Sequence, residues 1–367
     1  MAGEDTDATD WSAPSLDTAA ALLAQHPEQR ERLWDCLVAI EAAIQPHHPI
    51  NLREFLTGPI ANALLQPGEL LTRTVGDDLV INFRNTSKIG RDLALARAAV
   101  PDHVWEPQTT RSIVSLAAGR SQVLIGGAYI GDHALFAARV LAPGGLCHCF
   151  ELSDASLDLL RMNIAANGMG NLVVNPQALW SSDGVEIALD GDDSLASPVV
   201  ATGSARQTFV SRTIDSYAAE AGIDVIDLIV LDIEGGEHEV LRGAAQFLAQ
   251  PPETAPALIC EIHSAYVDWS QGLRHTPLCR LMIEHGYEVF ALRDIWSCEP
   301  IDSDHVELVD LDSTYLEGPP HGINVLAVKT RDRLCPDTFR LVHGVSPKLL
   351  KHRDATLHWP LNTGEPL

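Results

Sequence analysis

SQVLIGGAYIGDHALFAARVLAPGGLCHCFE, residues 121–151, is the stretch that decides the fold. Two apolar runs frame a helical pattern; Gly126, Gly127 and Gly131 follow the first run and Glu151 closes the second. Strand, Gly-rich turn, helix, strand and acidic residue in that order are typical of a nucleotide-binding βαβ unit. Glycines let ligand oxygens approach the helix N-terminus, and the carboxylate accepts hydrogen bonds from a ribose diol. The stretch therefore predicts the adenosine half of a cofactor site.

A Gly-rich turn by itself is also compatible with an ordinary tight strand-to-helix turn. The acidic residue favours the cofactor, because Glu151 follows Gly127 by little more than the ~20 residues that the motif requires.

The composition describes an acidic globular protein. The chain has 367 residues, 46% of them hydrophobic and 20% charged, with a formal net charge of −25. Such a charge repels nucleic acid and anionic membranes, and no apolar run approaches the ~20 residues of a membrane span. We therefore expect a small-molecule acceptor that is neutral or cationic rather than polyanionic, and neither a nucleic-acid nor a membrane partner.

The cysteines and the N-terminus predict a reducing cytoplasm. The seven cysteines form no CxxC pair, and the acidic sequence MAGEDTDATD resembles neither a signal nor a transit peptide.

Four parts are expected along the chain. Residues 1–14 have the composition of a disordered tail, and residues 15–118 read as a mostly helical segment with a β-hairpin. This helical segment is expected to act as a lid, as a homodimer surface, or as both. Residues 119–330 form the cofactor-binding domain, and 331–367 form a C-terminal extension without a usable pattern.

Strands and helices alternate through the cofactor-binding domain, which predicts one doubly wound α/β sheet with helices on both faces. The seven expected strands are residues 123–125, 146–150, 172–175, 226–231, 257–262, 287–292 and 323–328. Ligands of such sheets gather where the strands end. Five polar or Gly-rich turns fall at that edge, those of Gly127, Glu151, Leu179, Asp232 and His263.

Three motifs carry a resemblance to the FkbM-type S-adenosylmethionine-dependent methyltransferases over about residues 105–330: VLIGGAYIGDH (123–133), ALWSSDG (178–184) and IVLDIEGGEHEVLRGA (229–244). ICEIH (259–263) supports them, and the third motif is the most specific. The resemblance implies the Rossmann-like class I methyltransferase fold, a seven-stranded and mostly parallel sheet whose last strand is antiparallel. It also implies methyl transfer to oxygen, often that of a sugar or natural-product hydroxyl.

The resemblance also implies roles for residues. Gly127, Ala128 and Gly131 would cradle the methionine portion of the cofactor, Glu151 would hold the ribose, and Ala178 with Leu179 would line the adenine. Asp232 and Glu234 would face the reacting centre, with Glu234 and Glu237 near the substrate. The remaining expected cofactor contacts are Gly126, Tyr129, His133, Leu152, Trp180 and Glu106.

The chain departs from the family pattern at Ile125, where a carboxylate is usual, and at Tyr129, where a small polar residue is commoner. The usual carboxylate helps to bind the ammonium group of the cofactor, so Glu106 or Asp132 is expected to replace it.

Methyl transfer to an alcohol needs alignment of the acceptor oxygen and a group that removes its proton. His263 is the expected general base, because imidazole titrates near neutral pH, and Glu261 lies two residues earlier on the same strand face, where it would orient His263. An equally weighted reading is that both residues only fix loops. Mg²⁺ held by Asp232, Glu261 and His263 is the second choice for activating the hydroxyl.

Two other functions stay open. An NAD-dependent oxidoreductase would share the βαβ unit but should show a full G-x-G-x-x-G, which GGAYIG lacks. A catalytically silent binding or assembly protein with the same fold is compatible with Ile125.

Overall fold

The computed structural model describes residues 16–66, 68–85, 87–97, 104–191, 197–201, 207–299, 301, 303–316, 318, 322–359 and 364–367. The predicted disordered tail, 1–14, lies outside these residues. Within them, no helix has the length and apolar character that a membrane crossing requires.

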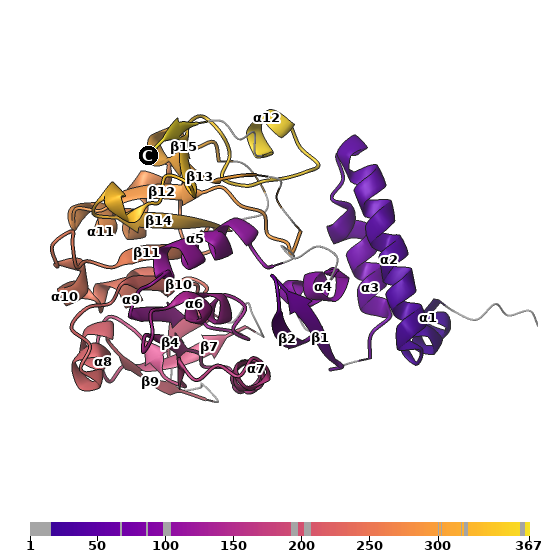
Figure 1. The fold of residues 1–367 in the computed structure, drawn as a ribbon, viewed down its shortest axis with the longest axis horizontal. Coiled ribbons are helices and arrows are strands. Elements are labelled where there is room, and N and C mark those ends of the chain that lie inside the picture. The colour runs from indigo at the N-terminus through magenta and orange to yellow at the C-terminus, as the bar shows by residue number, and fades with distance from the viewer. Residues whose placement is uncertain are drawn as a thin grey trace, which may run out of the picture.

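One large sheet organises the chain (Figure 1). Its seven predicted strands are observed as β3 (Gln122–Gly126), β4 (Leu146–Phe150), β5 (Leu172–Asn175), β10 (Leu228–Leu231), β11 (Ala257–His263), β12 (Glu288–Leu292) and β14 (Gly322–Val328). They lie in the order β5-β4-β3-β10-β11-β14-β12. All are parallel except β14, which pairs antiparallel with both β11 and β12.

The predicted strand number was too low, because the described residues place ten strands in this sheet. β13 (Val306–Asp310), β15 (Phe339–Val342) and β16 (Glu365–Pro366) extend it beyond β12. Glu307 interrupts the apolar pattern of β13, yet it is buried and pairs with Arg293 at 2.7 Å. A buried carboxylate is tolerated only with such a partner, which local sequence does not reveal. The extension at 331–367, which showed no pattern, thus supplies two sheet strands.

Helices cover both faces of the large sheet, as predicted for a doubly wound fold. Ile113, Leu116 and Leu160 join the core on one face, and Ile214, Leu241 and Met282 join the core on the other. The first face carries α5 (Pro107–Ala117), α6 (Ala134–Val140) and α7 (Asp154–Ala166). The second carries α8 (Ile214–Ala221), α9 (Glu237–Arg242), α10 (Ala245–Leu248) and α11 (Pro277–Glu284).

A smaller sheet follows the third strand. It comprises β6 (Ala178–Leu179), β7 (Glu186–Asp190), β8 (Ser197–Val200) and β9 (Phe209–Arg212). β7 and β8 pair antiparallel, and residues 192–196 between them lie outside the described residues.

The N-terminal segment is helical with one hairpin, as predicted. It contains α1 (Leu16–Ala24), α2 (Pro27–Ile44), the π-helical turn η2 (Arg53–Thr57), α3 (Gly58–Ala63), the hairpin β1 (Leu70–Val75) and β2 (Leu79–Arg84), and α4 (Lys88–Leu95). Helices α1 to α3 stand apart from the large sheet, with β1, β2 and α4 between them (Figure 1). The hairpin is fixed to α7, since Asn163 and Asn167 accept hydrogen bonds from Asn82 and Val80 on β2. This attachment brings α4 towards the edge where the parallel strands end.

Candidate functional site

A cavity lies at the carboxyl ends of β3, β4, β10 and β11, the edge at which a ligand was predicted. Fourteen of its lining residues were predicted from the sequence: Glu106, Gly126, Gly127, Tyr129, Asp132, His133, Glu151, Leu152, Ala178, Leu179, Asp232, Glu234, Glu261 and His263. The others are Lys88, Ile89, Trp105, Phe150, Ser153, Ser156, Gln177, Leu189, Pro198, Ile233 and Trp296.

The Gly-rich turn packs directly on the end of β10. Gly127 has φ 77°, and a Cβ built on it would lie 1.7 Å from the carbonyl oxygen of Asp232. The N–H groups of Gly127 and Ala128 both donate to the carbonyl of Phe150 at 3.0 Å. Only glycine permits this close approach of two backbones.

Ala128 and Gly131, for which a contact with the cofactor was predicted, shape the turn and lie outside the cavity lining. Ala128 is buried, and its N–H is used within the fold. A Cβ on Gly131 would lie 2.9 Å from Leu160, so this glycine allows α7 to pack against the turn.

Glu151 has a structural task beside the expected one. Its Oε2 accepts from the N–H of Tyr129 at 2.8 Å, and its Oε1 accepts from the N–H groups of Leu152 and Ser153 at 2.7 and 2.8 Å. Burial raises the pKa of this carboxyl group, while the three N–H donors oppose that rise. Glu151 therefore joins the ends of β3 and β4 while it lines the cavity.

We expect Glu151→Ala to weaken binding of S-adenosylmethionine by more than tenfold and to lower the free energy of unfolding by about 2–4 kcal/mol, because three N–H groups lose a charged acceptor. Calorimetric titration and urea denaturation would measure the two effects. Glu253→Ala, at an exposed position before β11, is the control and should change neither. Wild-type stability of the Glu151 variant would contradict the structural part of this role.

Beyond Glu151 the cavity wall is apolar. Ala178 and Leu179 on β6 lie there with Phe150 and Leu189, a surface suited to a flat heteroaromatic ring. Trp180, the other residue predicted here, lies outside the cavity lining and packs beside the core on the α8–α11 face, close to Gly236.

Three buried ionisable side chains form the next part of the wall. Glu106 accepts from Asn324 Nδ2 at 2.8 Å and lies 3.7 Å from His133 Nε2. Burial alone lowers the pKa of His133, but the nearby carboxylates of Glu106, Asp132 and Asp232 more than offset it and raise this pKa to about 9. His133 is thus an imidazolium ion at neutral pH. Burial raises the pKa of Asp132.

Ile125, the departure from the family pattern, points into the sheet core and not into the cavity. It is 2% exposed and pairs in register with Cys149 and Val230. Glu106 and Asp132, the expected substitutes for a carboxylate, both line the cavity.

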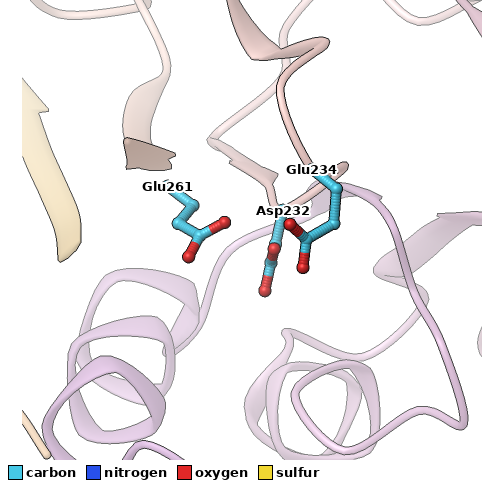
Figure 2. A group of neighbouring side chains, drawn as sticks. All are labelled: Asp232, Glu234 and Glu261. Carbon is cyan, nitrogen blue, oxygen red and sulfur yellow. The ribbon is translucent and has the colours of Figure 1, made fainter. Parts of the chain in front are cut away.

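Three carboxylates meet at the far end of the cavity: Asp232, Glu234 and Glu261 (Figure 2). One oxygen of each lies within 4.8 Å of the others. Burial raises the pKa values of Asp232 and Glu261, and the neighbouring carboxylates raise them further. Burial and Glu237 raise the pKa of Glu234 to about 7. The cation group predicted from the sequence is corrected here, because Glu234 and not His263 joins Asp232 and Glu261.

Glu237, for which a role in substrate binding was predicted, holds the loop that carries Glu234. Its Oε1 accepts from the N–H of Ile233 at 2.9 Å and from that of Gly235 at 3.1 Å. It is buried and lies outside the cavity lining.

His263 lines the cavity but is poorly arranged as a base. Its Nδ1 accepts a hydrogen bond from the N–H of Ala265 at 3.0 Å, so the neutral ring carries its proton on Nε2. The ring stacks on Trp296, with centroids 6.1 Å apart and an interplanar angle of 15°. Accepting a proton at Nδ1 would therefore break the bond of His263 to the loop.

Lys88 was missed by the sequence analysis. It begins α4, and its Nζ lies 6.0 Å from the ring centroid of Trp105 and 5.5 Å from that of Trp296. Burial lowers the pKa of Lys88, although nearby carboxylates oppose this. No local pattern marks these three residues, because only the docking of the N-terminal segment brings them to the strand edge.

The strand order, the Gly-rich turn with Glu151 and the cavity at the strand ends define a Rossmann-like α/β fold, and one family model matches part of it. Residues 126–289 match the family described as methyltransferase FkbM domain. The predicted resemblance to the FkbM-type methyltransferases is confirmed for these residues, which make up a little less than half of the chain.

Similarity to solved structures is distant. An O-methyltransferase from Bacillus cereus in complex with SAH is 15% identical, with a TM-score of 0.35 over 63% of this chain and 86% of that one. The O-methyltransferase TomG from Streptomyces achromogenes, involved in tomaymycin synthesis, is 9% identical, with a TM-score of 0.35 over 63% of this chain and 84% of that one. Comparison with curated proteins gives no match.

Proposed function

We propose that the chain transfers the methyl group of S-adenosylmethionine to a hydroxyl oxygen of a small neutral or cationic acceptor, such as a sugar or a natural product. The observation that carries this proposal is the continuity of the cavity. It joins the Gly-rich turn and Glu151 to an acidic end, within the domain that matches the family.

The side chains suit the cofactor along its whole length. The apolar wall of Ala178, Leu179 and Phe150 accommodates the adenine, and Glu151 accommodates the ribose. The cofactor's ammonium group is assigned to Glu106 and Asp132, since buried carboxylates are stabilised by a cation. The bound cofactor supplies an electrophilic methyl group on a sulfonium.

The acceptor is assigned to the part of the cavity between Trp105, Trp296 and His263. Aromatic faces bind the apolar face of a sugar or a natural product, and the Nε2–H of His263 donates to an acceptor oxygen. Alignment of that oxygen with the methyl carbon is the main task of these residues.

Lys88, rather than His263, is assigned as the group that receives the hydroxyl proton. Burial lowers the pKa of Lys88, which favours its neutral amine, whereas Nε2 of neutral His263 already carries a proton. In the transfer, the oxygen–methyl bond forms as the sulfur–methyl bond breaks, and the hydroxyl proton passes to Nζ.

We expect Lys88→Met to lower kcat by about 100-fold at pH 7.5, and His263→Asn to lower it by less than tenfold. Each variant should bind S-adenosylhomocysteine with wild-type affinity. The assay is methyl transfer from labelled S-adenosylmethionine to a panel of hydroxylated acceptors, with Lys88→Arg as the charge-retaining control. A larger reduction of kcat in His263→Asn than in Lys88→Met would identify His263 as the base.

The first experiment is calorimetric titration with S-adenosylmethionine, S-adenosylhomocysteine and NAD. Binding of both sulfur nucleosides without heat from NAD supports the assignment of the cavity. Binding without turnover on any acceptor would favour a catalytically silent binding or assembly protein.

The cytoplasm remains the proposed location, because all seven cysteines are free thiols, including Cys147 and Cys149, whose sulfur atoms lie 3.9 Å apart. A homodimer through the N-terminal helices also remains a proposal.

A further inference from the structure

Two carboxylates of the acidic group occupy adjacent positions on adjacent parallel strands. Leu231 pairs in register with Cys260, so Asp232 and Glu261, the next residue on each strand, lie beside each other at the sheet edge. One carboxylate oxygen of each lies within 4.8 Å of the other (Figure 2). Like charges placed so closely repel each other unless a cation lies between them.

The third carboxylate reaches the group through an unfavourable backbone conformation. Glu234 has φ 56°, in the left-handed region that favours glycine. The loop is kept in place by Glu237 and by the Ser197 hydroxyl, which donates to the Glu234 carbonyl at 2.6 Å. Backbone strain maintained by several contacts is characteristic of functional sites.

Glu261 lacks the partners that a buried carboxylate normally has. It is 7% exposed, and its Oε2 is enclosed without a hydrogen-bond partner among the described residues. Asn324, its register partner on β14, donates instead to Glu106 and Thr109. Gly322 leaves the space that this carboxylate occupies, because a Cβ there would lie 2.2 Å from Oε1. A buried carboxylate oxygen without a partner, in a group whose carboxylates lie within 4.8 Å of one another, is explained by a bound ligand.

Acidic groups outnumber basic ones around the whole cavity. Its lining contains six carboxylic acids, Glu106, Asp132, Glu151, Asp232, Glu234 and Glu261, against Lys88, His133 and His263. S-adenosylmethionine contributes only one net positive charge, and its ammonium group is assigned to Glu106 and Asp132.

We propose that Asp232, Glu234 and Glu261 bind one hard divalent cation, Mg²⁺ or Mn²⁺, at the carboxyl ends of β10 and β11. Carboxylate oxygens are the ligands that these ions prefer, and a cation here removes the repulsion and satisfies Glu261. If the proposed function holds, an acceptor hydroxyl bound to this ion becomes more acidic and loses its proton more readily.

The test is titration of the purified full chain, freed of metal by a chelator, with Mn²⁺. Electron paramagnetic resonance of unbound Mn²⁺ should give one site per chain, with Mg²⁺ competing for it. Saturating Mn²⁺ should raise Tm by about 3 °C.

Glu261→Gln is the decisive variant. It should weaken Mn²⁺ binding by more than tenfold and lose the Tm increase. Without metal it should be at least as stable as the wild type, because one of three repelling charges is gone. Asp232→Asn should behave in the same way, and Glu253→Gln is the control. Unchanged Mn²⁺ binding by Glu261→Gln, or no bound Mn²⁺ in the wild type, would overturn the proposal.

S-adenosylmethionine binding, measured on the same samples, separates the two proposals. Cofactor binding without Mn²⁺ binding refutes the cation site and leaves the proposed function intact. Mn²⁺ binding without cofactor binding refutes the proposed function and leaves the cation site intact. Loss of cofactor binding with retained Mn²⁺ binding in Glu261→Gln would show that the carboxylates serve the cofactor, and the cation proposal would fall.

Discussion

Replacement of Gly127 by alanine is expected to abolish S-adenosylmethionine binding and to lower the free energy of unfolding by about 3 kcal/mol or more. The added Cβ would lie 1.7 Å from the Asp232 carbonyl oxygen, and the backbone has φ 77°. The left-handed conformation alone costs an alanine about 1–2 kcal/mol. The overlap adds to this cost, because the Gly-rich turn and the end of β10 must move apart. That movement shifts the cofactor loop and the acidic group together.

The matched control is Gly144→Ala. Gly144 has φ 83°, but a Cβ there meets nothing within 4 Å. The free energy of unfolding of this variant should fall only by the cost of the left-handed conformation, and its binding of S-adenosylmethionine should equal that of the wild type. Urea denaturation and calorimetric titration of both variants separate backbone strain from overlap. Binding by Gly127→Ala within threefold of the wild type would refute the assigned contact.

The second large effect is a decline in the free energy of unfolding as pH rises from about 5 to about 9. Burial raises the pKa of Asp294 to about 7, and burial with Glu237 raises that of Glu234 to about 7. Carboxylates raise the pKa of His133 to about 9 against the effect of burial. A group whose folded pKa exceeds its unfolded value contributes stability below the unfolded pKa and loses it as pH passes the folded pKa.

The three groups lose their contributions to stability over different parts of the pH range. Asp294 and Glu234 act between about pH 4 and 7, and His133 acts between about pH 6.5 and 9. His133 alone accounts for about 3 kcal/mol if its whole shift is expressed as stability. Lys88 acts in the opposite direction near the upper end, because burial lowers its pKa.

Urea denaturation at pH 5.5, 7, 8 and 9.5 in the presence of a chelator measures this decline. His133→Gln should flatten the curve between pH 7 and 9 and leave the lower part unchanged. A free energy of unfolding of the wild type that rises from pH 5.5 to 9.5 would show that the pKa values of these groups are not raised in the folded protein.

The sequence by itself determined the seven central strands, the helices between them and the edge at which the ligand site forms. These features are local: apolar runs and helical periodicity depend on near neighbours in the chain, and parallel strands place their ends together. Glu151 and Asp232 could be located for this reason, because each directly follows an apolar strand.

Only the tertiary structure decided the rest, because the deciding partners are far apart in sequence. Glu307 becomes part of a strand when Arg293 neutralises it. Lys88 joins the cavity when the N-terminal hairpin docks on α7. In the motif 229–244, the left-handed backbone at Glu234 places its carboxylate near that of Glu261. Glu237 instead accepts a hydrogen bond from the loop backbone. Sequence placed these carboxylates on one edge, and the direction of each followed from contacts that no local pattern encodes.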